Sequence, residues 1–133
     1  MSAASNQALY DILTTDADII ALVPVAKVSM GVQKAKPTTF PCIIVTQIGG
    51  SDVGYIGYGS APSGSKFGME RLSYQIDIYN QTVPKTNLTI LDAMKVPLMR
   101  NGYHKTSDND IWDDAFNAYR KITRWDVITD HLD

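Results

Sequence analysis

The stretch Glu70-Arg-Leu-Ser-Tyr-Gln-Ile-Asp-Ile-Tyr79 (ERLSYQIDIY) carries the clearest periodicity in this chain of 133 residues. Apolar and polar side chains alternate along it. The apolar set is Leu72, Tyr74, Ile76 and Ile78, and the polar set is Arg71, Ser73, Gln75 and Asp77. Successive side chains of a strand point to opposite faces, so the pattern predicts a strand with one buried face and one wet or interfacial face.

Three further segments have the composition of strands. Residues 42–47 (CIIVTQ) are a continuous, β-branched apolar run, which predicts a central strand covered on both faces. Residues 27–32 can form a short strand. Residues 118–129 predict a last strand with Trp125 and Val127 on one face.

Apolar residues recur at helical spacing before the first predicted strand and again between the strand at residues 70–79 and the last strand. Residues 6–14 predict a short amphipathic helix, and a second helical turn begins near residues 15–18 and stops before Pro24. A further helix ends at Asn101-Gly102, where a left-handed cap is favourable, and Pro97 should kink or shorten it. Its apolar stripe comprises Leu88, Leu91, Met94, Lys95 and Leu98.

The order of these elements predicts an α+β fold. Helices are too few to alternate with every strand, so we expect a mostly antiparallel sheet with two or three helices packed on one face and a long glycine-rich loop. The length is near the commonest domain size, so residues 1–133 are expected to form a single domain.

Composition narrows the function classes. Apolar residues make up 44% and charged residues 20%, as in globular proteins, and the formal net charge is −2. No run of Lys or Arg is present, which argues against free-standing binding to nucleic acid or to an anionic membrane. The N-terminal residues lack the features of a signal peptide, so we expect a cytoplasmic protein.

The glycine-rich stretch from Gly49 to Gly68 has three interpretations: a phosphate-binding loop, a slack surface insertion, or an arm ordered by another chain. Gly59 and Gly64 have the spacing of a P-loop, but Ser65 separates Gly64 from Lys66, and the stretch runs into a strand where the motif requires a helix.

Ordering such a stretch is expensive. It would cost on the order of 20 to 40 kcal/mol, whereas a domain has a net stability of only about 5 to 15 kcal/mol. The stretch therefore either stays mobile or gains contacts from elsewhere. Its large side chains, Tyr55, Ile56, Tyr58 and Phe67, favour contacts with another chain.

The sequence gives little support for a catalytic or metal-binding site. Residues 107–114 (SDNDIWDD) predict an acidic loop, but Trp112 occupies a ligand position of the calcium-loop template, so a solvated turn is the better interpretation. His104 and His131 stand alone. The single cysteine, Cys42, lies in an apolar run and is interpreted as a buried thiol. We therefore expect no catalytic, metal-binding or cofactor-binding residues and no cofactor.

Five blocks of the chain, taken in order, resemble the tail-completion proteins of long-tailed bacteriophages, the group of tail terminators and tail-to-head joining proteins. The blocks are ALYDILTTDADIIALVP, FPCIIVTQIGG, ERLSYQIDIYNQT, ILDAMKVPLMRNGY and AYRKITRWDVI. The resemblance extends along nearly the whole chain in the right order, and none of the blocks is a catalytic signature. The glycine-rich and acidic loops are longer than in the shorter members of the group.

The resemblance implies a non-enzymatic virion protein. It would form a ring, usually of six copies, at the head-proximal end of the tail, and would terminate the tail tube or join it to the head. Its implied partners are its own copies, the tail tube protein and a head connector or adaptor, with DNA only in transit through the channel and no membrane. The implied location is the virion tail or neck, after assembly in the host cytoplasm.

The residues expected in contacts between subunits or within the neck lie around the glycine-rich stretch. They are Asp52, Tyr55, Tyr58, Lys66 and Phe67, followed by Arg71, Gln75 and Asp77 on the strand face expected to be exposed. Two alternatives remain open from the sequence. One is another small assembly or adaptor module, and the other is a metal- or phosphate-dependent enzyme that uses the acidic loop or the glycine-rich stretch.

Overall fold

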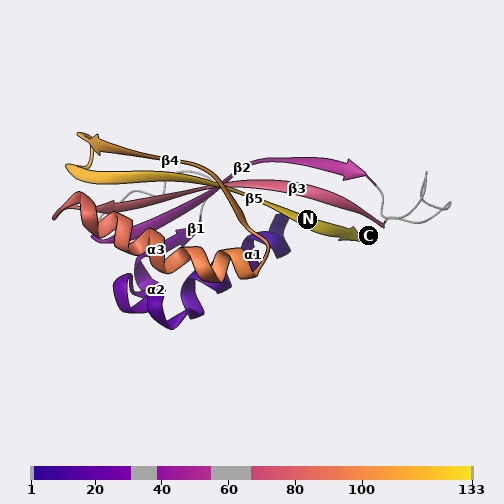
Figure 1. Ribbon diagram of the computed structural model, residues 1–133, viewed down its shortest axis with the longest axis horizontal. Helices are drawn as coiled ribbons and strands as arrows, with labels where there is room; N and C mark the ends of the chain where they lie inside the picture. Colours follow the sequence, from indigo (N-terminus) through magenta and orange to yellow (C-terminus); the bar gives the residue numbers. More distant parts are fainter. Residues whose placement is uncertain (1, 31–38, 55–66, 133) are drawn as a thin grey trace.

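The fold has a layer of helices packed on one face of a five-stranded sheet, as a computed structural model shows (Figure 1). The structure describes residues 2–30, 39–54 and 67–132. The elements in chain order are α1 (Ser2–Thr15), α2 (Ala17–Leu22), a 3-10 turn (Val25–Lys27), β1 (Val28–Met30), β2 (Cys42–Gly54), β3 (Phe67–Asn80), α3 (Pro84–Arg100), β4 (His104–Asp113) and β5 (Ala118–Leu132). The predicted α+β class is confirmed.

The strand order in the sheet is β1-β2-β3-β5-β4. β1 pairs with β2 in parallel, and the other three pairings are antiparallel. The alternating segment quoted above lies within β3, which occupies the centre, so β2 is next to the centre and is not itself the central strand. Coverage of β2 on both faces is confirmed at its start, where Cys42, Ile43, Ile44 and Val45 are all buried.

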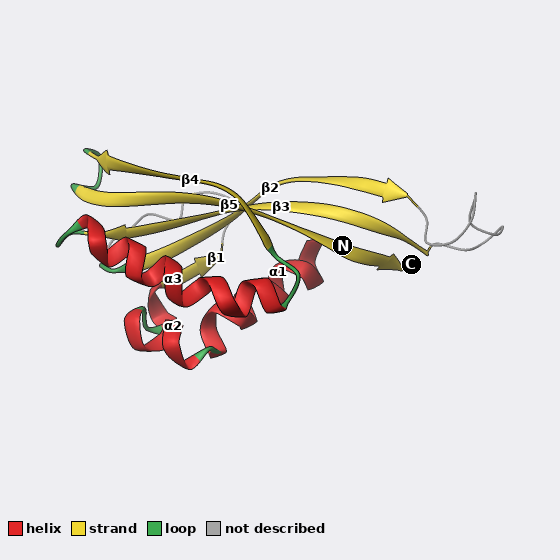
Figure 2. Ribbon diagram, viewed as in Figure 1, coloured by secondary structure: helices red, strands yellow, loops and turns green. Residues whose placement is uncertain are grey.

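The main core lies between the helices and the sheet, whose helix-covered face is evident in Figure 2. All four predicted apolar residues of β3 are buried there, together with Trp125 and Val127 of β5. The helices contribute Leu9, Leu13, Ile19, Ile90, Leu91, Met94 and Leu98. Among the described residues, no helix is long and apolar enough to cross a membrane.

Local interactions define the helix ends. The Asp16 carboxylate accepts hydrogen bonds from the backbone N–H groups of Asp18 (3.0 Å) and Ile19 (3.1 Å), which starts α2 and separates it from α1. The predicted cap after α3 is confirmed at Gly102, whose φ of 86° is a left-handed conformation that favours glycine.

Two details of α3 concern the prediction. Pro97 lies inside the helix and does not shorten it, since the helix continues to Arg100, and the kink at Pro97 stays a prediction. Leu88 is exposed, and the buried stripe uses Asn87 and Ile90 instead. Asn87 faces inward because its side chain accepts a hydrogen bond from Asn80 at the end of β3. Leu88, the next residue of the helix, therefore faces solvent.

Two segments predicted as loops are strands. Residues 49–54 extend β2 and pair with β3 as far as Gly54 opposite Met69, and residues 107–113 belong to β4, which pairs with β5. Gly, Asp and Asn have low strand propensity, but a partner strand overrides that local preference. The remainder of the glycine-rich stretch, residues 55–66, lies outside the described residues.

Candidate assembly interface

The sheet face turned away from the helices is named here the open face. By strand alternation it carries Arg71, Ser73 and Gln75 of β3, with Asp126 and Arg124 of β5 opposite Ser73 and Gln75. Arg71 and Arg124 are exposed, and the Ser73 hydroxyl donates a hydrogen bond to the Asp126 carboxylate at 2.7 Å. None of the helices that the structure describes covers this polar strand face (Figure 2).

Asp77 does not belong to the exposed part of this face, so the predicted exposure is wrong. Its residue exposure is 5%, and its carboxylate accepts hydrogen bonds from Arg120 Nη2 (3.1 Å) and from Gln75 Nε2 (3.2 Å). The Arg120 guanidinium also lies 5.5 Å from the ring centroid of Tyr79 and 3.5 Å from the Asp113 carboxylate. Ion pairing within the chain thus explains why a charged residue is buried here.

Gln75 lies in the middle of β3, opposite Thr46 and Arg124, whereas three other predicted interface residues lie at one end of the sheet. Asp52 of β2 pairs with Glu70 of β3, Phe67 begins β3 opposite Leu132, and Arg71 pairs with Ser51 on one side and Ile128 on the other. The remaining three predicted residues, Tyr55, Tyr58 and Lys66, lie outside the described residues. The interface role of all eight stays a prediction.

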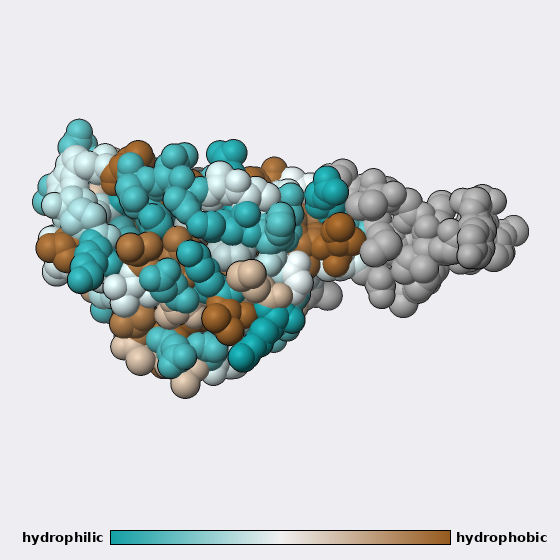
Figure 3. All heavy atoms as spheres, viewed as in Figure 1, coloured by the Kyte–Doolittle hydropathy of each residue, from teal (hydrophilic) through white to brown (hydrophobic). Residues whose placement is uncertain are grey.

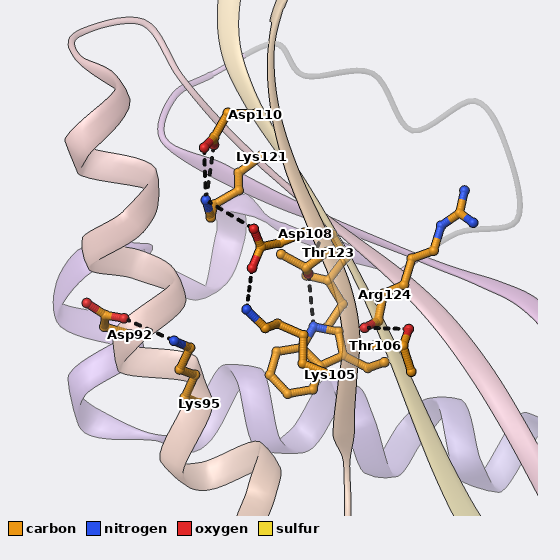
Figure 4. A network of polar contacts seen from close by, with 11 residues as sticks. Asp92, Lys95, Lys105, Thr106, Asp108, Asp110, Lys121, Thr123 and Arg124 are labelled. Atoms are coloured by element: carbon orange, nitrogen blue, oxygen red, sulfur yellow. Dashed lines mark hydrogen bonds and ion pairs between the residues drawn. The ribbon is translucent and has the colours of Figure 1, made fainter.

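The acidic residues of β4 and of the turn that follows it are each paired within the chain. Asp110 binds Lys121 Nζ at 3.1 Å, and Asp108 binds Lys105, as Figure 4 shows. Asp113 pairs with Arg120, and the Asp114 carboxylate accepts from Trp112 Nε1 at 2.7 Å. In the parts of the chain that the structure describes, no three ligating side chains group into a metal site. The pairs of Asp110 with Lys121 and of Asp113 with Arg120 link β4 to β5, so these residues form a paired strand and not the predicted acidic loop.

The same pairing affects titration of one of these acids. The hydrogen bond from Lys105 lowers the pKa of the Asp108 carboxyl, because the cation stabilises the charged form. A lowered carboxyl pKa is typical of a structural ion pair, whereas a carboxyl group that acts as a general acid needs a raised pKa.

A pocket that sequence reasoning missed lies at the opposite end of the sheet from Gly54 and Phe67. Its volume is about 180 Å³. It is lined by Pro84, Asn87, Asp110, Ile111, Trp112, Tyr119 and Arg120. Trp112, an aromatic residue within the polar residues 107–114, was the sequence signal for this pocket. The prediction of a loop there gave no reason to expect one.

Cys42 is buried, as predicted, beside Ile44 and Tyr79. Burial raises the pKa of its thiol to about 11, with a smaller opposing effect of Lys27. A thiolate is the reactive form, so Cys42 has little nucleophilic character near neutral pH.

We expect Cys42 to react with Ellman's reagent at pH 8 about 100-fold more slowly in the native protein than in guanidinium, since each pKa unit changes the thiolate fraction about tenfold. An exposed-cysteine variant, Ser107→Cys, should react at the unfolded rate and serves as the control. Because the native pKa is raised, the contribution of the neutral thiol to stability is complete below about pH 9 and is lost as the pH rises through about 11. Rapid native labelling of Cys42 at pH 8 would contradict its burial.

Comparison with known proteins finds similarity of fold but no similarity of sequence to a known family. No protein-family model matches the sequence, and no curated protein matches it. Among solved structures, a chain of the structure entitled "Virion of native gene transfer agent (GTA) particle" is similar, with a TM-score of 0.68 and 12% sequence identity over 97% of this chain and 98% of that chain. The chain therefore shares the fold of a virion component over nearly the whole length of both.

Proposed function

We propose that this chain is a structural virion protein that forms a ring at the head-proximal end of a tail, with the six copies that the family resemblance implies. In this position it terminates the tail tube or joins the tube to the head connector, and DNA passes through the central channel. The observation that carries the proposal is the full-length similarity of fold to a chain of a virion particle. The ordered series of sequence blocks that resembles phage tail-completion proteins supports the same role.

The partners follow from that position. They are neighbouring copies of the chain, the tail tube protein and the head connector or adaptor, and residues 1–133 act as a single domain. The location is the virion, after assembly in the host cytoplasm. A non-enzymatic role is supported by the acidic residues of β4, which are ion-paired within the chain: Asp108 with Lys105, Asp110 with Lys121 and Asp113 with Arg120.

The surfaces of the molecule suit a ring. A cyclic ring is built from head-to-tail contacts, in which one patch of a subunit meets a different patch of the next. The predicted interface residues Asp52, Phe67 and Arg71 lie at one end of the sheet, and the exposed Trp112 lies at the other. Two different contact surfaces on opposite ends of an elongated subunit satisfy this requirement.

The test is ring formation by the purified protein and by a Tyr55→Ala/Tyr58→Ala variant. Tyrosines at an interface bury large area at a small entropic cost, so we expect wild-type rings in negative-stain electron microscopy and a shift to monomer in the variant, with an unchanged far-UV circular dichroism spectrum. The matched control is Tyr10→Ala, which removes a half-buried tyrosine of α1. Undiminished ring formation by the double variant would exclude these tyrosines from the interface. A wild-type protein that neither forms rings nor joins tails would contradict the proposed function.

A further inference from the structure

We propose that the pocket beside Trp112 is the acceptor for residues 55–66 of a neighbouring copy, so that one end of each subunit binds the opposite end of the next. This inference rests on the proposed ring and names the contact that builds it. The acceptor, named here the Trp112 patch, consists of the pocket lining together with the adjacent Val83 and Leu88.

The Trp112 patch has a rigid floor. Asn80 at the end of β3 donates a hydrogen bond from Nδ2 to Asn87 Oδ1 at 2.6 Å, and Asn87 Nδ2 donates to the Tyr119 carbonyl at 3.1 Å. The Asn80 side chain also accepts from the backbone N–H of Val83 at 3.1 Å, which fixes the start of α3. The end of β3, the start of α3 and the start of β5 are thus held together beneath the pocket, and a preformed surface of this kind loses little entropy on binding.

The rim of the patch is more apolar than solvent contact requires. Trp112 is 46% exposed and packs edge-to-face against Tyr119 with ring centroids 5.0 Å apart, while Val83 is 51% exposed and Ile111 and Leu88 are exposed as well. Apolar side chains appear among polar ones at this end of the molecule, over β4 and the first turn of α3 (Figure 3). Exposed aromatic and aliphatic residues around a pocket are the usual centre of a protein interface.

The pocket suits a side chain better than a free ligand. Its volume of about 180 Å³ is below the roughly 300–1,000 Å³ of small-molecule sites. The part of this chain with a matching surplus of apolar side chains is residues 55–66, which contain Tyr55, Ile56 and Tyr58. Both surfaces lack dense charge of one sign, so aromatic packing is the recognition chemistry.

Chain length makes this contact intermolecular. β3 has 14 residues, so Phe67 at its start and Asn80 beside the pocket are about 40 Å apart. A segment anchored at both Gly54 and Phe67 must extend outward and return, and twelve residues reach no further than about 22 Å in that way. Residues 55–66 therefore cannot reach the pocket of their own copy, whereas the pocket of another copy is accessible to them.

The experiment is disulfide trapping with a Ser60→Cys/Val83→Cys variant of the full chain under mild oxidation, which leaves Tyr55, Ile56 and Tyr58 in place. Head-to-tail docking predicts a ladder of covalent multimers on a non-reducing gel. The matched control is Ser60→Cys/Met99→Cys, because Val83 is the N-cap of α3 whereas Met99, which is 64% exposed, lies near the other end of that helix. The native Cys42 is buried, so the unmodified protein supplies the blank.

A ladder with Val83 and at most a trace with Met99 is the expected result. Equal ladders from both variants, or no ladder from either, would overturn the inference. Rings seen by electron microscopy without the Val83 cross-link would also overturn the docking inference. The proposed function would then stand, and the Trp112 patch would be free to bind another particle component. A ladder without closed rings would support the contact and contradict the ring.

Discussion

Replacement of Trp125 by alanine is expected to lower the free energy of unfolding by about 3–5 kcal/mol, as large-to-small changes at fully buried aromatic residues do. Trp125 is completely buried at the centre of the sheet, opposite Tyr74 of β3. Its indole Nε1 donates a hydrogen bond to Thr123 Oγ1 at 2.9 Å, and that hydroxyl donates to the Ile76 carbonyl at 2.8 Å. The substitution leaves a cavity and removes the donor to a buried hydroxyl, and urea unfolding followed by circular dichroism measures the loss.

The second tryptophan provides the control. Trp112→Ala removes the same side chain from a half-exposed position, so we expect a loss of only about 1 kcal/mol, from the contact with Tyr119. If Trp125→Ala does not fold, the milder Trp125→Phe still has to destabilise more than Trp112→Phe. Equal losses at the two positions would contradict the placement of β5.

Arg120→Met is expected to lower the free energy of unfolding by about 2–4 kcal/mol, because removal of one partner of a buried ion pair leaves an uncompensated charge. Arg120 is the cation shared by Asp77 and Asp113, and the Asp77 side chain is almost fully buried. The value is set below that of a fully buried pair because the Arg120 side chain is partly exposed. Chemical denaturation at pH 7 measures the change.

A double-mutant cycle with Asp77→Asn separates the charge effect from lost packing. The double variant should be more stable than the sum of the two single losses predicts, because the unpaired carboxylate is then absent. The control is Arg124→Met on the same strand, where the side chain is exposed and a change within about 0.5 kcal/mol is expected. Strict additivity between Arg120 and Asp77 would show that the two side chains do not interact in solution.

The sequence predicted those parts of the fold in which side-chain periodicity reflects burial. The alternation from Leu72 to Ile78 identified β3, and the placement of Trp125 and Val127 on one face of β5 is confirmed. It failed in residues 49–54 and in residues 107–113, because pairing with β3 and β5 overrides the low strand propensity of Gly, Asp and Asn there.

The candidate site was only partly accessible from sequence. Alternation correctly placed Arg71 on an exposed strand face, but it could not show that Arg120, 43 residues further along the chain, neutralises Asp77. The Trp112 patch was missed because separate elements build it. Trp112 and Tyr119 face each other across the β4–β5 hairpin, and Asn87 near the start of α3 joins them by donating a hydrogen bond to the Tyr119 carbonyl. That last contact spans 32 residues and leaves no local pattern in the sequence.

The long ladder between β3 and β5 has a consequence for how the chain reaches this fold. β4 and β5 are joined by a four-residue turn, whereas β3 and β5 become neighbours only after α3 and β4 have been bridged. Closing a long segment costs entropy before any non-local contact forms, and it slows folding. The terminal hairpin is therefore expected to form early and the central ladder late, with its formation as the step that limits the folding rate.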